Sequence, residues 1–234
     1  MTCGPCSFQM QGVVHGSTMD RNIVEDGCYE RPVVEKVIET TGRGDIVWDV
    51  GTGVGYYALV FAQILDSPEQ IFCVEGSGKQ IRRFERNFRG QTRRPKLIRA
   101  LVSDATAPGR VTLDQMWRTK MAPAPTAIKM DIEGAELFAI EGARELIAEV
   151  RPKLFIEVHP QRISRFAPDG VRRFFDPLFE HYDIDYVRNH WGSFKGDGTT
   201  EWQRGTRGHI LAMCDDIVIS SAFPRAFMIY CHAK

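Results

Sequence analysis

Long apolar runs are missing from this sequence. No stretch approaches the roughly 20 consecutive apolar residues that a membrane-spanning helix needs. The opening residues, MTCGPCSFQMQG, also lack the basic region followed by an apolar run that a secretory signal peptide requires. We therefore expect no membrane partner and a cytoplasmic location, where cysteines are normally reduced.

An excess of charge of either sign is also missing. Thirty Lys and Arg residues balance thirty Asp and Glu residues, so no overall field attracts nucleic acid or a membrane surface. A local basic cluster lies on an expected helix and the loop after it, and it consists of Arg82, Arg83, Arg86, Arg89, Arg93 and Arg94. We interpret this cluster as a solvated face and expect no nucleic-acid partner.

Internal repeats and low-complexity tracts are absent too, and the 234 residues fit one domain. Cysteine is sparse, with six residues, of which Cys3 and Cys6 form a CGPC motif. Thioredoxin-type chemistry needs such a motif between a strand and a helix N-terminus, where the helix dipole lowers the thiol pKa. Because only two residues precede Cys3, we interpret the motif as a frayed terminus and expect all six cysteines to be reduced.

The chain does contain an alternation of short β-branched runs and longer helical patterns, which is typical of βαβ units around a parallel sheet. The expected strands are residues 46–50, 71–75, 96–102, 127–131, 153–158, 184–187 and 226–231. The expected helices are residues 31–40, 56–65, 79–88, 133–149 and 171–179. The pattern predicts a Rossmann-like α/β domain, with a mostly parallel seven-stranded sheet and helices on both faces.

Two segments do not follow this alternation. Residues 1–44 form an N-terminal extension, which we expect to cap the cofactor-binding core of residues 45–187. Residues 188–213 are rich in glycine yet contain Trp191, Phe194 and Trp202. Because loops of that length usually serve a function or are disordered, we predict that this segment is a substrate loop. Residues 214–234 then form the C-terminal strand region.

A glycine-rich loop, residues 49–55 (DVGTGVG), begins at the end of an apolar strand and opens a helix. Glycines allow a tight turn and let a ligand approach the main chain, and the N–H groups at the helix start favour a carboxylate or phosphate. Dinucleotide enzymes use G-x-G-x-x-G, whereas this loop reads D-x-G-x-G-x-G, which resembles the first motif of methyltransferases.

Glu75 is the second signal, since it ends the second expected strand 26 residues after Asp49. An acidic side chain at this place is positioned to accept hydrogen bonds from both hydroxyls of a ribose. The loop and Glu75 together predict an adenosine-containing ligand. They do not by themselves decide between a methyl donor and a nicotinamide cofactor.

Two later stretches, residues 128–136 (IKMDIEGAE) and 151–159 (RPKLFIEVH), closely resemble the signature of the FkbM family of methyltransferases. Residues 27–30 (GCYE) and 101–104 (LVSD) also resemble motifs of that family. The resemblance covers about residues 27–160. It departs at Thr52-Gly53, where the family more often has Ala-Asn, and in the C-terminal third, where no family motif is visible, so substrate identity does not carry over.

The resemblance implies a class I methyltransferase fold, in which the last strand of the sheet is antiparallel. It also implies S-adenosylmethionine as the donor and an oxygen acceptor, here a hydroxyl on a small molecule or sugar. It implies that the loop lines the methionine end of the donor, that Glu75 binds the ribose, and that Ser103 and Asp104 lie near the adenine. The complete set of cofactor-binding residues that we expect is Glu30, Asp49, Gly51, Thr52, Gly53, Gly55, Tyr56, Glu75, Gly76, Ser77, Ser103, Asp104 and Asp131.

Asp131, Glu157 and His159 are the candidate catalytic residues, because an alcohol acceptor needs help to lose its proton. Glu157 and His159 share a face of their strand, and neutral histidine has a pKa suited to proton transfer. We therefore expect His159 to take the hydroxyl proton and Asp131 to position the donor methyl and the acceptor. His159 could equally be a strand-end histidine that hydrogen-bonds to the backbone. Asp131 with His159 or Glu157 would also suit Mg²⁺, but no tight metal-ligand spacing is visible, so we assign no metal.

Two other functions remain compatible with the sequence. A NAD(P)-dependent oxidoreductase shares the strand–glycine–helix arrangement. The loop spacing and the stretch 128–136 argue against an oxidoreductase. A non-catalytic relative would bind the cofactor and show no turnover. The expected partner is a small-molecule acceptor, and a homodimer is compatible with the sequence.

Overall fold

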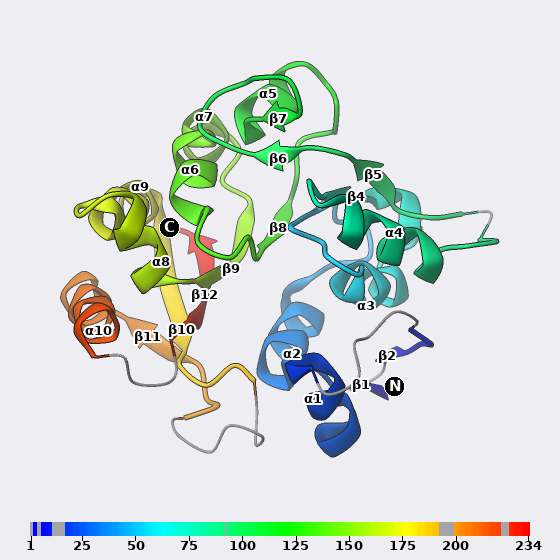
Figure 1. Cartoon of the computed structure of the whole chain (residues 1–234), viewed down its shortest axis with the longest axis horizontal. Coiled ribbons are helices and arrows are strands. Elements are labelled where there is room, and N and C mark those ends of the chain that lie inside the picture. The colour runs from blue at the N-terminus through cyan, green and yellow to red at the C-terminus, as the bar shows by residue number, and fades with distance from the viewer. Residues whose placement is uncertain (1, 4–5, 11–16, 92, 192–198, 221–224) are drawn as a thin grey trace.

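A central sheet of eight strands organises the computed structural model, which describes residues 2–3, 6–10, 17–91, 93–191, 199–220 and 225–234 (Figure 1). In spatial order the strands are β11 (Gln203–Gly205), β10 (Tyr182–Val187), β12 (Phe227–Ala233), β9 (Lys153–Val158), β8 (Ala127–Met130), β3 (Val47–Val50), β4 (Ile71–Val74) and β5 (Lys96–Ile98). The five strands from β9 to β5 are parallel, and β12 runs antiparallel to β9 and β10. The expected fold class is confirmed.

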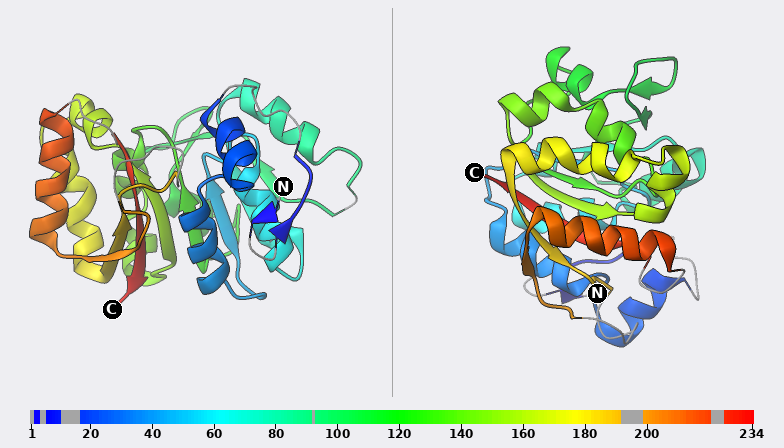
Figure 2. Two further views of the ribbon diagram at one scale, coloured as in Figure 1. Left: turned by 90° about the horizontal axis from the view of Figure 1, so that it is seen from below. Right: turned by 90° about the vertical axis from the view of Figure 1, so that its left-hand side faces the viewer.

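Helices cover both faces of the sheet and make a three-layered molecule (Figure 2). One face carries α2 (Arg31–Thr40), α3 (Tyr56–Ile64) and α4 (Gly78–Asn87). The other carries α5 (Leu113–Arg118), α6 (Glu136–Glu141), α7 (Arg144–Glu149), α8 (Pro160–Phe166), α9 (Gly170–His181) and α10 (Arg207–Ile219). The remaining elements are α1 (Thr18–Asp26), the 3-10 helix η1 (Pro68–Gln70) and the short strands β1 (Thr2–Cys3), β2 (Cys6–Ser7), β6 (Leu101–Val102) and β7 (Arg110–Val111).

The central strands are buried on both sides, as parallel strands between two helix layers must be. Every residue of β3, β4 and β8 is buried. Trp48 and Val50 pack into the core under α5–α10, whereas Val47 packs into the core under α2–α4. The near-continuous apolar runs of the sequence therefore correspond to the inner strands, whose carboxyl ends form one edge of the sheet.

The helix ends follow local chemistry. The hydroxyl of Ser77 accepts a hydrogen bond from the Gln80 N–H at the start of α4, and that of Thr206 accepts one from His209 at the start of α10. Such caps satisfy N–H groups that have no partner within the helix. Pro32 and Pro160 lie in the first turns of α2 and α8, where proline costs no hydrogen bond.

Three expected elements differ in the structure. The sheet has eight strands, not seven, because the short edge strand β11 pairs with β10. The expected strand 96–102 is divided, since β6 leaves the sheet and pairs with β7. The expected helix 133–149 breaks into α6 and α7 at Gly142, where a Cβ atom would lie 2.3 Å from the Ser103 carbonyl oxygen.

The expected substrate loop, residues 188–213, is only partly irregular, because it contains β11 and the first half of α10. Trp191 is buried, and the Trp202 indole N–H donates to the Pro32 carbonyl oxygen over 3.0 Å. Phe194 lies outside the described residues. The two described aromatic side chains are thus packed against the body of the protein.

The N-terminal residues also depart from expectation. Thr2 and Cys3 pair with Ser7 and Cys6 in a two-stranded antiparallel sheet, where we expected a frayed end. Cys28 is disulfide-bonded, which contradicts the expectation that all six cysteines are reduced. The free cysteines are Cys6, Cys73, Cys214 and Cys231. Within the described ranges, no helix combines the length and the apolar character that crossing a membrane requires.

Candidate functional site

Four parallel strands bring their carboxyl ends to one edge of the sheet. Strand β3 pairs in register with β4 and β8, and β8 pairs in register with β9. The next residues along these strands at the edge are Gly51, Glu75, Asp131 and Glu157. Residues more than 100 positions apart in the chain are thereby collected at the place where open α/β sheets bind ligands.

A cavity of 430 Å³ lies at this edge. Eight of the thirteen expected cofactor residues line it, namely Asp49, Gly51, Thr52, Gly53, Tyr56, Glu75, Gly76 and Asp131. Lining residues that the sequence did not suggest include Met19, Tyr57, Gln80, Leu101 and Lys129. The local motifs therefore indicated part of the cavity lining, and the rest comes from residues to which the motifs gave no ligand-binding role.

Two glycines of the loop, Gly51 and Gly53, have different structural roles. Gly51 has φ +77°, and a Cβ atom there would lie 2.0 Å from the Asp131 carbonyl oxygen. Gly53 has φ +57°, and the only atom near its Cβ position is the Gly51 carbonyl oxygen at 3.9 Å. Gly51 thus allows β3 and β8 to end side by side, whereas Gly53 leaves space in the cavity for a ligand to meet the main chain.

Asp49 is buried at the floor of the cavity and accepts a hydrogen bond of 2.5 Å from the Thr52 hydroxyl. Burial raises the pKa of Asp49 to about 6, against the opposing effects of the Thr52 hydrogen bond and the Lys129 charge. The charged form of a carboxylate held in this way is stabilised when a cationic group of a ligand approaches it.

Glu75 connects the two loops that follow β3 and β4. Its carboxylate accepts hydrogen bonds from the Gly53 N–H at 3.0 Å and from the Ser77 N–H at 2.7 Å. A carboxylate has about four lone-pair positions, so acceptor capacity remains for two ligand hydroxyls. The backbone contacts fix the orientation in which Glu75 faces the cavity.

Five expected cofactor residues do not line the cavity. Gly55 faces the rings of Phe84 and Phe88, and Ser77 caps α4. The Ser103 hydroxyl donates to the Asp104 carboxylate over 3.0 Å, outside the cavity lining. The remaining residue, Glu30, is buried in a separate cluster of side chains that is described below.

A second cavity of 440 Å³ lies beside the first. Tyr29, Asp131 and Glu133 line both cavities, so these residues mark the boundary between them. The other lining residues of the second cavity are Glu157, His159, Gln161, Arg162, Arg165, Trp191, Arg225 and Ala226. All three expected catalytic residues, Asp131, Glu157 and His159, therefore meet in one cavity.

Asp131 and His159 differ in how they are held. The Oδ1 atom of Asp131 is buried and has no hydrogen-bond partner among the described residues. The His159 Nδ1 atom lies 3.0 Å from Glu136, and its Nε2 atom lies 3.4 Å from Glu133 and 3.7 Å from Glu157. Burial lowers the pKa of His159, but the Glu136 hydrogen bond and the charges of Glu157 and Asp131 together raise it to about 9.

Lys129 is a buried cation that sequence reasoning did not assign to the site. Its ammonium lies 4.6 Å from the centre of the Tyr57 ring. Burial lowers the pKa of Lys129, but the carboxylates of Asp131, Glu30 and Glu157 more than offset this and raise it. The alternating pattern of β8 could have shown that Lys129 faces the same helix layer as Tyr57, but not that acidic groups surround it.

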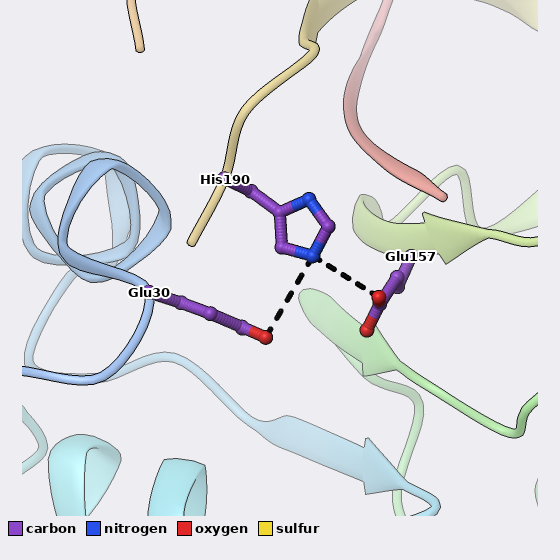
Figure 3. Close-up of side chains that lie close together, drawn as sticks. All are labelled: Glu30, Glu157 and His190. Carbon is purple, nitrogen blue, oxygen red and sulfur yellow. Dashed lines mark hydrogen bonds and ion pairs between the residues drawn. The ribbon is translucent and has the colours of Figure 1, made fainter. Parts of the chain in front are cut away.

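Glu30, Glu157 and His190 form a further cluster, in which the three side chains point toward one another (Figure 3). The His190 Nε2 atom lies 3.0 Å from Glu157 and 3.9 Å from Glu30. Burial lowers the pKa of His190 to about 4. Burial and the nearby carboxylates of Asp131 and Glu30 raise the pKa of Glu157 well above its ordinary value. Sequence reasoning assigned no role to His190, because no paired histidine spacing accompanies it.

Comparisons with known proteins bear on the family and the fold of this chain. A family model described as the methyltransferase FkbM domain matches residues 60–188. A structure of methyltransferase FkbM from Methylobacillus flagellatus KT is 18% identical, with a TM-score of 0.54. The match covers 82% of this chain and 44% of that one, so this chain spans less than half the length of that structure.

Two further structures share the fold. Precorrin-6y C5,15-methyltransferase from Geobacter metallireducens is 12% identical, with a TM-score of 0.50 over 88% of both chains. Fibrillarin from Aeropyrum pernix, solved with natively bound S-adenosyl-L-methionine, is 14% identical, with a TM-score of 0.50 over 81% of this chain and 67% of that one. None of the curated proteins matches the sequence significantly.

Proposed function

We propose a function from the premise that the chain belongs to the methyltransferase FkbM family, whose domain model matches residues 60–188. In this proposal the protein transfers a methyl group from S-adenosylmethionine to a hydroxyl oxygen of a small molecule or sugar. The observation that carries the proposal is the pair of adjoining cavities at the carboxyl edge of the sheet, which share Tyr29, Asp131 and Glu133.

The first cavity suits the donor. Glu75 keeps acceptor capacity for the two ribose hydroxyls, and Gly53 leaves the main chain open beside it. The methionine end carries an ammonium and the donor sulfur is a sulfonium, so both are cationic. Asp49 and Asp131 line the same cavity, and their carboxylates would attract these two groups.

The second cavity suits the acceptor. In the reaction a hydroxyl oxygen attacks the methyl carbon, the carbon–sulfur bond breaks with its electrons going to sulfur, and S-adenosylhomocysteine is left. The protein's main contribution is alignment of donor and acceptor at near-attack distance, which can lower the barrier by several kcal/mol. Asp131 lines both cavities, so it is placed to contact donor and acceptor together.

Asp131 is proposed as the acceptor of the hydroxyl proton. Its Oδ1 atom is buried with no hydrogen-bond partner among the described residues, so it is available to an incoming hydroxyl. His159 has both ring nitrogens directed at carboxylates, so in this proposal it is a positioning residue and not the base expected from the sequence. Glu157 lines the same cavity, beside the imidazole that it helps to hold.

Calorimetric titration tests the donor assignment. S-adenosylhomocysteine should bind with 1:1 stoichiometry and stabilise the fold by mass action, whereas NADH should do neither. Stabilisation by NADH and not by S-adenosylhomocysteine would mean an oxidoreductase. Binding of S-adenosylhomocysteine without methyl transfer to any of a panel of hydroxyl compounds would indicate a non-catalytic relative.

Asp131→Asn tests the role of the carboxylate. The substitution keeps the size of the side chain but removes the base, so turnover should fall by roughly 10²–10⁴-fold. Affinity for S-adenosylmethionine should fall less, because only one charge near the sulfonium is lost. Asp169→Asn, at an exposed carboxylate that contacts Arg173, is the matched control and should change neither quantity. Unchanged turnover in Asp131→Asn would rule out this role.

A further inference from the structure

Three ligating atoms from distant parts of the chain meet beside the acceptor cavity (Figure 3). Glu30 precedes α2, Glu157 lies on β9, and His190 follows β10. One oxygen of each glutamate and a ring nitrogen of the histidine all lie within 4.8 Å of one another. In the close-up, Glu30 and Glu157 approach the same ring nitrogen of His190 from two sides.

The cluster is almost completely removed from solvent. Glu30 is 1% exposed, Glu157 is 5% exposed and His190 is 0% exposed. The Oε2 atom of Glu30 accepts a hydrogen bond from the Tyr57 hydroxyl over 2.7 Å. Its Oε1 atom points into the cluster and has no hydrogen-bond partner among the described residues. A buried carboxylate oxygen without a hydrogen-bond partner is costly, so this atom needs a partner from outside the described residues.

The backbone at Glu30 directs the side chain into the cluster. Glu30 has φ 51° and ψ 48°, a left-handed conformation that is unfavourable for a residue other than glycine. It occupies the N-cap position of α2, yet its side chain makes no capping hydrogen bond. Strained residues of this kind gather at functional sites, where the surrounding structure holds them in place.

A shared proton explains only part of the arrangement. A proton between Glu157 and His190 accounts for their 3.0 Å contact. It leaves the Glu30 oxygen 3.9 Å from the imidazole and without a partner among the described residues. A divalent cation between the three groups would contact this oxygen as well. Their ligating atoms already lie within 4.8 Å of one another and would have to draw in to about 3.0–3.4 Å around an ion held at about 2.1 Å.

We propose that Glu30, Glu157 and His190 form a binding site for a divalent transition-metal cation. One imidazole and two carboxylates favour ions such as Mn²⁺, Fe²⁺ and Zn²⁺ over Mg²⁺, which prefers oxygen ligands alone. The proposal departs from the expectation that no metal is bound, which is itself untested. It does not depend on the proposed methyl transfer, since its evidence is the geometry of the three ligating groups and not the binding of a methyl donor.

A neighbouring group of possible ligands, Asp131, Glu133 and His159, is less suitable. The carboxylate of Glu133 has a relative exposure of 64% and pairs with Arg162 at 2.5 Å. His159 already faces Glu136 at 3.0 Å through its other ring nitrogen. Glu133 and His159 are thus already paired with protein groups, so this second group supplies a comparison for the experiment.

Titration with Mn²⁺ tests the site. Mn²⁺ has little affinity for thiolates, so the cysteines do not compete for it, and loss of the free-ion electron paramagnetic resonance signal counts the bound ions. Protein treated with EDTA and then freed of the chelator should bind one Mn²⁺ per chain. Mg²⁺ should displace it only at more than tenfold higher concentration.

Variants assign the ligands. Glu30→Gln and His190→Gln should each weaken Mn²⁺ binding by more than 100-fold, whereas Glu133→Gln should retain it within threefold. Glu30→Gln keeps an oxygen for the Tyr57 hydroxyl, so it remains informative if His190→Gln does not fold, as circular dichroism would show.

Two results would overturn the site. One is the absence of stoichiometric Mn²⁺ binding, which would leave a protonated carboxyl–imidazole pair. The other is equal Mn²⁺ affinity in the wild type and Glu30→Gln. Calorimetry with S-adenosylhomocysteine on the same metal-free samples tests the proposed function separately. Normal binding of S-adenosylhomocysteine without binding of Mn²⁺ would overturn the metal site alone.

Discussion

Glu75 illustrates how one side chain both shapes the site and serves a ligand. Its carboxylate is held by two backbone N–H groups from the loops after β3 and β4. It also faces the cavity in which the donor is proposed to bind. Its identity could be predicted from the sequence, because the interval from the glycine loop through one helix to the next strand is local and regular.

The first prediction concerns this carboxylate. Glu75→Gln removes the charge from two hydrogen bonds to the ribose, each worth roughly 1.5–3 kcal/mol when charge-assisted. Affinity for S-adenosylhomocysteine, measured by calorimetry, should fall at least tenfold. Glu180→Gln, at an exposed position on α9, is the control and should bind as the wild type does. Unchanged affinity in Glu75→Gln would remove Glu75 from the ribose site.

The second prediction uses the titration of Asp49. Its folded pKa of about 6 lies above the ordinary value of 3.8, so the folded state binds this proton more tightly than the unfolded chain does. The wild type should therefore lose stability as the pH rises from about 4 to above 6. A shift of about two pKa units corresponds to about 3 kcal/mol.

Asp49→Asn removes that titration while leaving an oxygen for the Thr52 hydroxyl. Without ligand, the free energy of unfolding of this variant relative to the wild type should increase between pH 4 and pH 7, when measured by urea denaturation. Affinity for the cationic donor should fall in the same variant. A stability difference that does not change with pH would contradict the assigned pKa of Asp49.

At the scale of elements, the sequence predicted buried faces better than boundaries. Leu137, Ile140, Leu146 and Ile147 are all buried, as their helical spacing indicated. The break between α6 and α7 depends on the Ser103 carbonyl oxygen, which approaches Gly142 from a distant part of the chain. Helical periodicity cannot contain that information, because the contact arises only after the sheet has formed.

The third prediction concerns the start of α7, which α5 caps. The Asp114 carboxylate accepts hydrogen bonds from the Leu146 N–H at 2.8 Å and the Glu145 N–H at 3.1 Å. Asp114→Ala should lower the free energy of unfolding by about 1–2 kcal/mol. Asp114→Asn keeps one acceptor oxygen and should lose less. Because Asp114 lines neither cavity, S-adenosylhomocysteine affinity should stay constant, and a large change in affinity would contradict this purely structural role.

The cluster of Glu30, Glu157 and His190 could not be predicted from the sequence. Glu30 and Glu157 belong to the motifs at residues 27–30 and 151–159, but nothing in the spacing of these motifs relates them to His190. Strand β10 and the segment after it carry His190 across to β9, with β12 lying between the two strands. Only this strand order brings the imidazole to the carboxylates, so the candidate metal site could not be read from local patterns.

At the scale of the whole molecule, a parallel sheet concentrates acidic groups at one edge. The carboxyl ends of β3, β4, β8 and β9 lie together, and each contributes or is followed by a residue of the site. Buried carboxylates there are balanced in part by Lys129 and His159. The remaining negative charge suits cationic ligands, which is the common basis of the proposed sulfonium donor and the proposed metal.

A crystal structure of the protein with S-adenosylhomocysteine is the most direct test of this account. We expect the ribose hydroxyls within hydrogen-bond distance of the Glu75 carboxylate. The sulfur should face Asp131 at the boundary between the two cavities, with the methionine end near Asp49 and Gly53. Binding of the ligand outside this cavity, or with its sulfur directed away from Asp131, would contradict the central claim that the two cavities hold donor and acceptor.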